Sequence, residues 1–430
     1  MVSGTLRIAM TSVAPLRSRA FWILAGRSAV IGIFGGVFAV AFIGVEHALT
    51  GLVWGQTGGY EWFGGGLRAL VVPIAAGALV GLIYLVLGLP RRLHSFIEEL
   101  EEGRTDPGTA PGAVLVALVS LVGGASLGPE APLVTGAAGF ANWLTERVSA
   151  SPEDTRTATL SAAAGVFGGL MSSPLIGALL ALELEHDQDL PFFFRHIIPG
   201  GVSGTIGFLI VYPVLGAPFL GLYRFPPFEF SAWYLAAGAA MGVVGAIVGL
   251  SIGLVAKIVG RVVGRLPASP VARAAIGGCV LGAVGFMMPA TLFSGVDTLG
   301  AVVADPAEIG VGLLLAVVAL KMVTLTTSLR TGFYGGPFFP MFFIGGSVGA
   351  VLHLLFPAVP LALAVGATMA ATGAMASIPL SVAVLGAFVV GVGPPAAAVI
   401  SIAVIVAFSI GYGLGFVGPW SSAAAEPGPS

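Results

Sequence analysis

The sequence predicts an all-α membrane protein that crosses the bilayer many times. Hydrophobic residues make up 57% of the 430 positions and charged residues only 9%, which is far from the composition of soluble domains. Residues 331–425 contain no Asp, Glu, Lys or Arg, whereas one span needs about 20 apolar residues. This segment alone must therefore cross or re-enter the membrane several times.

Helices rather than barrel strands are indicated, because no segment alternates polar and apolar residues over about 10 positions. The 65 Gly and 29 Pro fall inside apolar runs, as expected where helices break or pack closely. We therefore expect broken and tilted helices. In chain order, charge-poor runs before residue 331 predict membrane segments at 28–45, 69–90, 107–129, 131–145, 157–182, 197–223, 230–256, 274–296 and 309–320.

Several other classes are excluded by what the sequence lacks. The single Cys279 cannot build a disulfide framework, and there is no metal-binding motif, nucleotide-binding loop or basic patch for nucleic acid, so we expect no cofactor. Arg17, Arg19 and Arg27 precede the first apolar run without the short core and cleavage site of a removable signal peptide. We expect one transmembrane domain over residues 1–430, with a short cytoplasmic N-terminus and a short C-terminal tail.

The chain also contains an internal repeat. SLVGGASLGPEAP (120–132) aligns without a gap with SLRTGFYGGPFFP (328–340), and GGLMSSPL (168–175) aligns with GAMASIPL (373–380). Two separate matches at nearly the same offset are unlike chance similarity. We place the two repeats at about 28–215 and about 230–416.

Loop charges indicate that the two repeats run in opposite directions, since Lys and Arg accumulate on the cytoplasmic side. Arg27 precedes the first span of repeat one, and Arg91 and Arg92 follow the second. In repeat two, Lys257 and Arg261 instead lie between the equivalent spans. This is the inverted-topology repeat of many transporters, which bind substrate where broken helices from both repeats meet.

The GPEAP and GPFFP segments, which end the repeated motif, are predicted to start helices because Pro suits the first turn of a helix. Free backbone N–H groups at a helix start favour an anion. We therefore predict an anion site from the segments around Gly128, Pro129 and Ala131 in repeat one and around Gly336, Pro337, Phe338 and Phe339 in repeat two. Uncharged backbone donors bind an anion less tightly than Lys or Arg would, so they permit its fast release.

Glu130 stands at the first of these helix starts. Its carboxylate would compete with a permeant anion, and protonation would release it. The alternative is that Glu130 only caps its own helix, as acidic residues do in a first turn. Ionisable groups within membrane segments are costly and usually functional, which favours a gating role.

On these residues the chain resembles the CLC family of chloride channels and chloride/proton exchangers. GPEAP resembles the family's gating-glutamate motif, and Glu130 aligns with the gating glutamate. GPFFP resembles the family's Gly-x-Phe-x-Pro motif. The resemblance runs from about residue 28 to 416. It implies a homodimer with one pore per subunit, chloride or a similar small anion as substrate, protons as a second substrate in some members, and a plasma or inner membrane location.

The chain departs from the family at three places. The family's anion-binding serine motif is missing, and Ser95 is a candidate replacement; a cytoplasmic loop with solvated charges is the alternative. Glu183 matches the first acid of a family pair, but Leu184 replaces the proton-transfer acid, so the proton pathway is incomplete unless Glu185, His186 or water replaces that acid. The alternative is that Glu183 and Glu185 are helix-end charges that face the cytoplasm. Tyr412 is the nearest candidate for the family's pore tyrosine, although Phe416 fits the spacing slightly better.

Three transport functions remain open on sequence alone: a chloride channel, a chloride/proton exchanger, and a relative that carries another anion such as fluoride or nitrate. A distant alternative is an intramembrane hydrolase, because Gly124 to Gly128 fits the G-x-S-x-G pattern with Ser126 as nucleophile. That chemistry needs a general base, and no histidine lies in an evident partner motif. We therefore do not expect an enzyme.

Overall fold

The computed structural model describes residues 18–55, 62–183, 193–216, 223–266, 269–376, 378–391 and 393–416. Regular secondary structure in these residues is helical, apart from one isolated bridge between Gly128 and Gly336. Eight of the described helices are long and apolar enough to cross a membrane, and three shorter apolar helices accompany them. The prediction of an all-α protein with many spans is confirmed.

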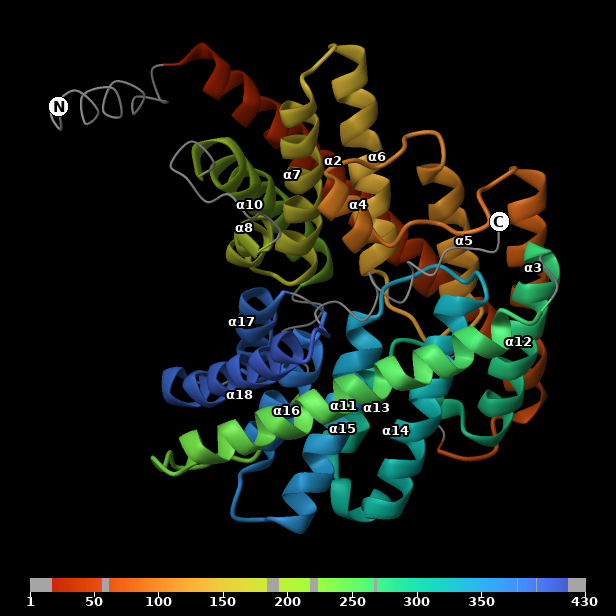
Figure 1. Cartoon of the computed structure of the whole chain (residues 1–430), viewed down its shortest axis with the longest axis vertical. Coiled ribbons are helices and arrows are strands. Elements are labelled where there is room, and N and C mark those ends of the chain that lie inside the picture. The colour runs from red at the N-terminus through yellow and green to blue at the C-terminus, as the bar shows by residue number, and fades with distance from the viewer. Residues whose placement is uncertain are drawn as a thin grey trace, which may run out of the picture.

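The helices form two groups that lie one above the other in Figure 1. The first group contains α2 (Arg19–Trp54), α3 (Gly66–Val86), α4 (Phe96–Glu102), α5 (Ala110–Val122), α6 (Glu130–Arg147), α7 (Pro152–Leu170), α8 (Pro174–Glu183), the π-helix η2 (Phe193–Ile197) and α10 (Ile198–Leu215). The second contains α11 (Tyr234–Val263), α12 (Pro270–Met287), the 3₁₀-helix η3 (Pro289–Thr291), α13 (Val296–Ala304), α14 (Pro306–Arg330), α15 (Phe338–Leu355), α16 (Leu361–Ala374), α17 (Pro379–Val390) and α18 (Pro394–Gly413).

Helix packing is the same in both groups. In the first group α2 packs against α7 and α10, and α7 also packs against α6 and α8; in the second, α11 packs against α16 and α18, and α16 packs against α15 and α17. Between the groups, α3 packs against α12 and α8 packs against α17, at opposite ends of the seam in Figure 1. This duplicated packing agrees with the internal repeat; the residue limits proposed for each repeat stay a prediction.

Glycine allows the closest approach across this seam. A Cβ on Gly77 of α3 would lie 2.3 Å from the carbonyl oxygen of Ala274 in α12, and a Cβ on Gly278 would lie 2.4 Å from that of Pro73. Real side chains cannot come so near, so both positions need glycine for the two backbones to touch. Small residues at helix contacts are typical of membrane proteins.

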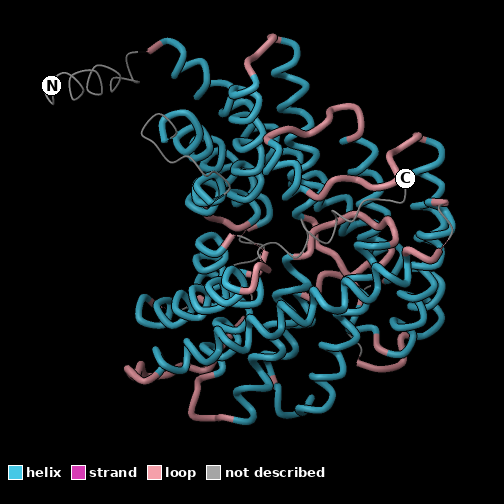
Figure 2. Tube along the Cα trace, in the orientation of Figure 1, coloured by secondary structure: helices cyan, strands magenta, loops and turns pink. Residues whose placement is uncertain are grey.

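Several helix boundaries differ from the predicted runs, and two of these differences are described here. Run 157–182 is not one helix, because the chain breaks after α7 at Met171, passes through Ser172 at φ 50, and restarts as α8 at Pro174. Pro disfavours helical backbone in the residue before it, which explains the break. The first span is longer than run 28–45, since α2 continues from Arg19 to Trp54. Loops gather between the two groups (Figure 2).

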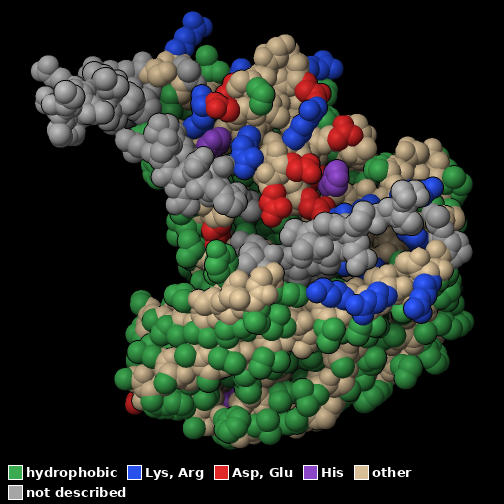
Figure 3. Space-filling model, in the orientation of Figure 1, with side chains coloured by type: hydrophobic (Ala, Val, Ile, Leu, Met, Phe, Trp, Pro, Cys, Tyr) green, Lys and Arg blue, Asp and Glu red, His purple; other side chains and the backbone are tan. Residues whose placement is uncertain are grey.

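Charged side chains gather over the first group on the face shown in Figure 3. Ion pairs in the first group join Arg27 to Asp154 at 3.6 Å and Arg104 to Glu146 at 3.0 Å, and two further pairs join Arg195 to Glu153 and Arg92 to Glu98. These residues lie near the start of α2, in and around α4, at the end of α6, at the start of α7 and in η2. The positive-inside rule assigns the start of α2 to the cytoplasm, so we take this face as cytoplasmic.

Lys321, in the middle of α14, is fully buried. Its Nζ donates to the carbonyl oxygens of Leu292 (2.8 Å) and Phe293 (2.6 Å), directly after η3. Phe293 has a left-handed backbone with φ 57, which a bulky residue adopts only where its surroundings hold it. Lys321 is thus a structural donor that fixes this turn.

We expect Lys321→Met to lower the stability of the protein, because it leaves these two buried carbonyl groups without their donor. Each unmet buried group costs about 1–3 kcal/mol. Thermal unfolding of the purified protein in detergent measures the effect, with Lys257→Met, on an exposed part of α11, as the control. An unfolding midpoint equal to that of the control would show that Lys321 does not hold the turn.

Candidate functional site

The two repeated motifs meet at the seam between the groups. The backbone N–H of Gly128 donates to the carbonyl of Gly336 at 2.7 Å, and the N–H of Gly336 donates back to Gly128 at 2.8 Å. Each motif then enters a helix, α6 after the N-cap Pro129 and α15 after the N-cap Pro337. The structure therefore brings together two helix starts that lie far apart in the sequence.

Both motif glycines are required by the same side chain. A Cβ on Gly128 would lie 2.0 Å from Oε2 of Glu130, and a Cβ on Gly336 would lie 2.0 Å from the carboxyl carbon of Glu130. Neither glycine has a φ that excludes other residues, so space rather than backbone conformation selects glycine here. The carboxyl group lies in the gap between the two segments.

Glu130 contacts the helix start of the opposite repeat. It is fully buried, and its Oε1 accepts a hydrogen bond of 2.8 Å from the backbone N–H of Phe338, the first residue of α15. Its Oε2 has no hydrogen-bond partner among the described residues. A carboxylate thus occupies the place that a helix start offers to an anion, which the interpretation as a cap of its own helix does not explain.

Other predicted residues surround this contact. Ala131 is buried in the first turn of α6, and Phe338 and Phe339 are buried in the first turn of α15. Phe338 also contacts Phe96 of α4, with ring centroids 5.7 Å apart at an interplanar angle of 65°. The start of a third helix, α4, therefore approaches the same site.

Ser95 is the N-cap of α4. Its Oγ accepts a hydrogen bond from the N–H of Glu98 (3.3 Å), and the Glu98 side chain accepts one from the N–H of Ser95 (2.9 Å), which together form a capping box. The preceding Arg91, Arg92 and His94 are exposed. Solvated charges therefore lead into a helix start next to Phe338, and the anion-binding role of Ser95 stays a prediction.

A cavity of about 240 Å³ reaches the site from the other direction. Leu127 and Pro129 line it beside the start of α6, and Glu46, His47 and Asp297 are among its other lining residues. Glu46 lies near the end of α2 that is remote from the cytoplasmic face. The cavity therefore lies between the end of α2 and the residues that precede Glu130.

Glu183 ends α8 and contacts the start of α17. Its carboxylate accepts hydrogen bonds from the backbone N–H groups of Leu380 and Ser381 and from the Ser381 hydroxyl. Glu183 therefore joins the two repeats at a second helix start. Leu184 and Glu185 lie outside the described residues, so the role predicted for Glu185 stays a prediction.

The structure does not bring Tyr412 to the site. Tyr412 lies at the end of α18, is 70% exposed, and stacks near Phe408 of the same helix. It was chosen by its distance along the chain, but α18 continues to Gly413 and directs this side chain outward. We therefore correct the assignment of Tyr412 as an anion-binding residue. Phe416 is half-buried and its ring lies 5.8 Å from the Lys257 ammonium.

Ser126 has no base within reach among the described residues. Its hydroxyl is buried without a hydrogen-bond partner, and its N–H points to the hydroxyl of Ser328 at 3.3 Å. The described histidines contact other groups, such as His196 with Thr157 and His353 with the carbonyl of Val359. A serine nucleophile needs a hydrogen-bonded base, so no observation favours the hydrolase alternative.

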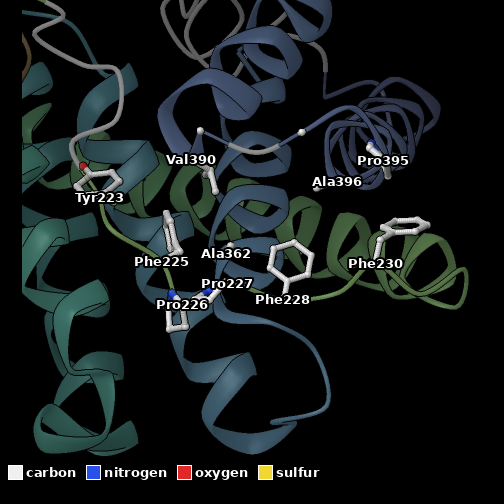
Figure 4. A pocket seen from close by; sticks show the side chains of 12 residues that line it. Tyr223, Phe225, Pro226, Pro227, Phe228, Phe230, Ala362, Val390, Pro395 and Ala396 are labelled. Atoms are coloured by element: carbon white, nitrogen blue, oxygen red, sulfur yellow. The ribbon is translucent and has the colours of Figure 1, made fainter.

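A larger cavity, of about 540 Å³, lies away from these residues. It is lined by the segment 223–230 and by the ends of α16, α17 and α18, and it contains no charged side chain (Figure 4). Phe225, Phe228 and Phe230 project into it from the extended segment before α11. Its aromatic and aliphatic lining does not suit a small hydrated anion.

Sequence comparison places the chain in a family. The profile of the family described as voltage gated chloride channel matches residues 77–411. This chain belongs to that family. The family resemblance inferred from GPEAP and GPFFP is thereby confirmed.

Relatives of this CLC protein include proteins that are named as ion-transport proteins. An ion-transport protein named YfeO from Salmonella schwarzengrund (strain CVM19633) is 30% identical over 278 residues, which are 63% of this chain and 65% of that protein. The YfeO protein of Salmonella newport (strain SL254) is 29% identical over the same length. The chain thus spans slightly less than two thirds of the length of these relatives.

Solved structures share the fold of this CLC protein. That of a slow cyanobacterial Cl⁻/H⁺ antiporter matches with a TM-score of 0.75 and 18% identity, covering 94% of this chain and 98% of the other. That of a CLC-type fluoride/proton antiporter matches with a TM-score of 0.72 and 19% identity, covering 90% and 95%. At these identities the likeness establishes the architecture, which confirms the predicted fold.

Sequence reasoning missed a group of polar residues below the site in this CLC protein. Glu99, Thr135 and Tyr334 are buried, and the Thr135 hydroxyl is hydrogen-bonded to both Glu99 and Tyr334. A signal for Glu99 was available, because Phe96, Glu99 and Leu100 have the spacing of one helix face, and both neighbours are apolar. Tyr334 lies inside the repeated motif itself, where it aligns with Ser126.

Proposed function

We propose that this protein transports small anions across the membrane and that Glu130 is its protonatable gate. The observation that carries the proposal is the hydrogen bond between Glu130 Oε1 and the first N–H of α15. A helix start in a buried place favours an anion, and the side chain that now occupies it can lose its charge by taking up a proton. An anion can then take its place.

Chloride is the proposed substrate, with fluoride and nitrate as the alternatives. The site offers backbone N–H groups and aromatic edges rather than Lys or Arg, which suits an anion that must leave again. Structural neighbours are named as Cl⁻/H⁺ and fluoride/proton antiporters. We therefore extend the proposal to proton-coupled exchange as well as to passive conduction, in a homodimer in the plasma or inner membrane.

Flux from liposomes tests the proposal. Vesicles that contain the purified full-length protein and a chloride, fluoride or nitrate gradient should release the anion faster than protein-free vesicles. Proton flux recorded beside anion flux separates the mechanisms, because only an exchanger drives protons uphill with an anion gradient. Folded protein that releases none of the three anions at any pH would contradict the proposed function.

A further inference from the structure

Glu99 is a buried carboxyl group on a short helix beside the proposed site. Helix α4 begins at the cap of Ser95 and ends at Gly103, which has the left-handed φ of 68 that favours glycine. Between them, Phe96, Glu99 and Leu100 are buried, whereas Glu101 and Glu102 are exposed. The sequence of α4 thus turns one of its acids toward the interior, where α4 packs against α6 and α7.

Hydroxyl groups are the hydrogen-bond partners of Glu99 among the described residues. Its Oε2 accepts from Thr135 Oγ1 of α6 at 2.8 Å and from Thr105 Oγ1 at 3.2 Å. Glu98 and Glu102 lie near it on its own helix, and Tyr334 and Tyr84 lie beyond Thr135.

The arginines around α4 have other partners. Arg92 pairs with Glu98, Arg104 pairs with Glu146, and Arg156 of α7 donates to the carbonyl of Glu101. Burial raises the pKa of Glu99 to about 8, against the two threonine hydrogen bonds, which lower it. The carboxyl group is therefore mostly protonated at neutral pH and becomes ionised as the pH rises through that value.

A chain of hydroxyls leads from Glu99 to the loop that carries Gly336. Thr135 Oγ1 lies 2.7 Å from Tyr334 Oη, and the backbone N–H of Tyr334 donates to Ser120 Oγ at 3.1 Å. Tyr334 precedes Gly336 by two residues, and Gly336 contacts both Gly128 and the Glu130 carboxyl. The chain therefore ends on the same segment that holds the gate.

Which group donates and which accepts in the hydrogen bonds from Glu99 through Thr135 to Tyr334 depends on the protonation state of Glu99. A hydroxyl donates a single hydrogen. While Glu99 is ionised, Thr135 donates to it and must accept from Tyr334. When Glu99 carries a proton on Oε2, the atom that faces Thr135, it can donate to Thr135, which then donates to Tyr334, and the Tyr334 hydrogen turns to another acceptor.

We propose that Glu99 is a proton-binding residue on the cytoplasmic side of the anion site, and that Thr135 and Tyr334 transmit its protonation state to the Gly336 segment. Glu99 is thus a positioning residue, which acts through Tyr334 and does not touch the anion. This inference rests on the transport function proposed above. It predicts a second titration of transport, distinct from that of Glu130.

Anion flux against pH tests the inference, measured in liposomes from about two units below to about two units above the pKa of Glu99. All proteins in this test carry Glu130→Gln, so that the gate itself does not titrate. On this background we expect a step of at least about five-fold in this range, the scale of ordinary coupling between sites. Adding Glu99→Gln, which cannot ionise, should keep the neutral-pH flux on the alkaline side. Glu102→Gln, on the exposed face of the same helix, should keep the step.

Variants of the hydroxyl chain separate transmission from a purely structural role. Thr135→Val should abolish the step although Glu99 is present, Thr135→Ser should restore it, and Glu99→Gln with Thr135→Val should do no more than either alone. A step that survives when Glu99→Gln or Thr135→Val is added to Glu130→Gln would overturn the inference, as would a Glu130→Gln protein without a step. None of these results touches the transport function, which fails only if the wild type moves no anion.

Discussion

Replacing Glu130 with Gln is expected to make anion flux independent of the gate's protonation. In the wild type, flux should rise as the pH falls, because protonation removes the charge that occupies the first N–H of α15. Gln has nearly the same shape but is always neutral, so its flux at neutral pH should equal that of the acidified wild type. We expect an increase of at least about ten-fold over wild type at neutral pH, or about 1.4 kcal/mol in the barrier.

Liposome flux across a pH series measures this effect, and Glu308→Gln is the matched control. Glu308 is also an acid in the first turn of a helix, α14, but it is exposed, and its backbone N–H bonds the cap Asp305 of the same helix. The control should transport like the wild type. A Glu130→Gln protein whose flux still follows the wild-type pH curve would exclude Glu130 as the gate.

The second large effect is expected from Gly336→Ala. The new methyl group would lie 2.0 Å from the carboxyl carbon of Glu130 and 2.1 Å from its Oε1. The Glu130 side chain must therefore move to make room for it. The methyl also fills the space in front of the α15 start, where an anion must bind. We expect flux to fall at least about ten-fold at every pH, because protonating Glu130 does not remove the obstruction.

A double variant separates the two consequences of this methyl group. Adding Glu130→Ala should relieve the clash and restore the thermal unfolding midpoint, while flux stays low because the path is still filled. Gly312→Ala in α14 is the control, since a Cβ there meets no atom within 4 Å. Wild-type flux in Gly336→Ala would mean that the anion passes elsewhere.

Local sequence signals predicted most of the fold and the two helix starts of the site, but not the contact between them. Pro129 and Pro337 predict helix starts because the preference of Pro for the first turn of a helix depends only on the local chain. The matched motifs predicted that Gly128 and Gly336 occupy equivalent places. The sequence could not predict which helix start donates a hydrogen bond to the Glu130 carboxylate. Its bond to Phe338 joins residues 208 positions apart and depends on how closely two backbones approach.

The errors have the same origin. Tyr412 was assigned by its distance along the chain, yet the direction of a side chain depends on where its helix ends and what packs around it. Run 157–182 was counted as one segment because hydropathy does not register a break at Ser172, where the residues on both sides are equally apolar. Glu99 was not identified from the sequence, although its spacing from Phe96 and Leu100 distinguishes it from Glu101 and Glu102.

The division of the gate between the two repeats has a consequence for biosynthesis. Glu130 leaves the ribosome well before its acceptor, the Phe338 amide 208 residues later, and at about 5–20 residues per second this interval is roughly 10–40 s. During that time the first repeat holds an acid at membrane depth without the helix end that later receives it. The nascent chain must therefore keep Glu130 protonated or hydrated until α15 has been inserted, so conditions that slow elongation between the two repeats should lower the yield of folded protein.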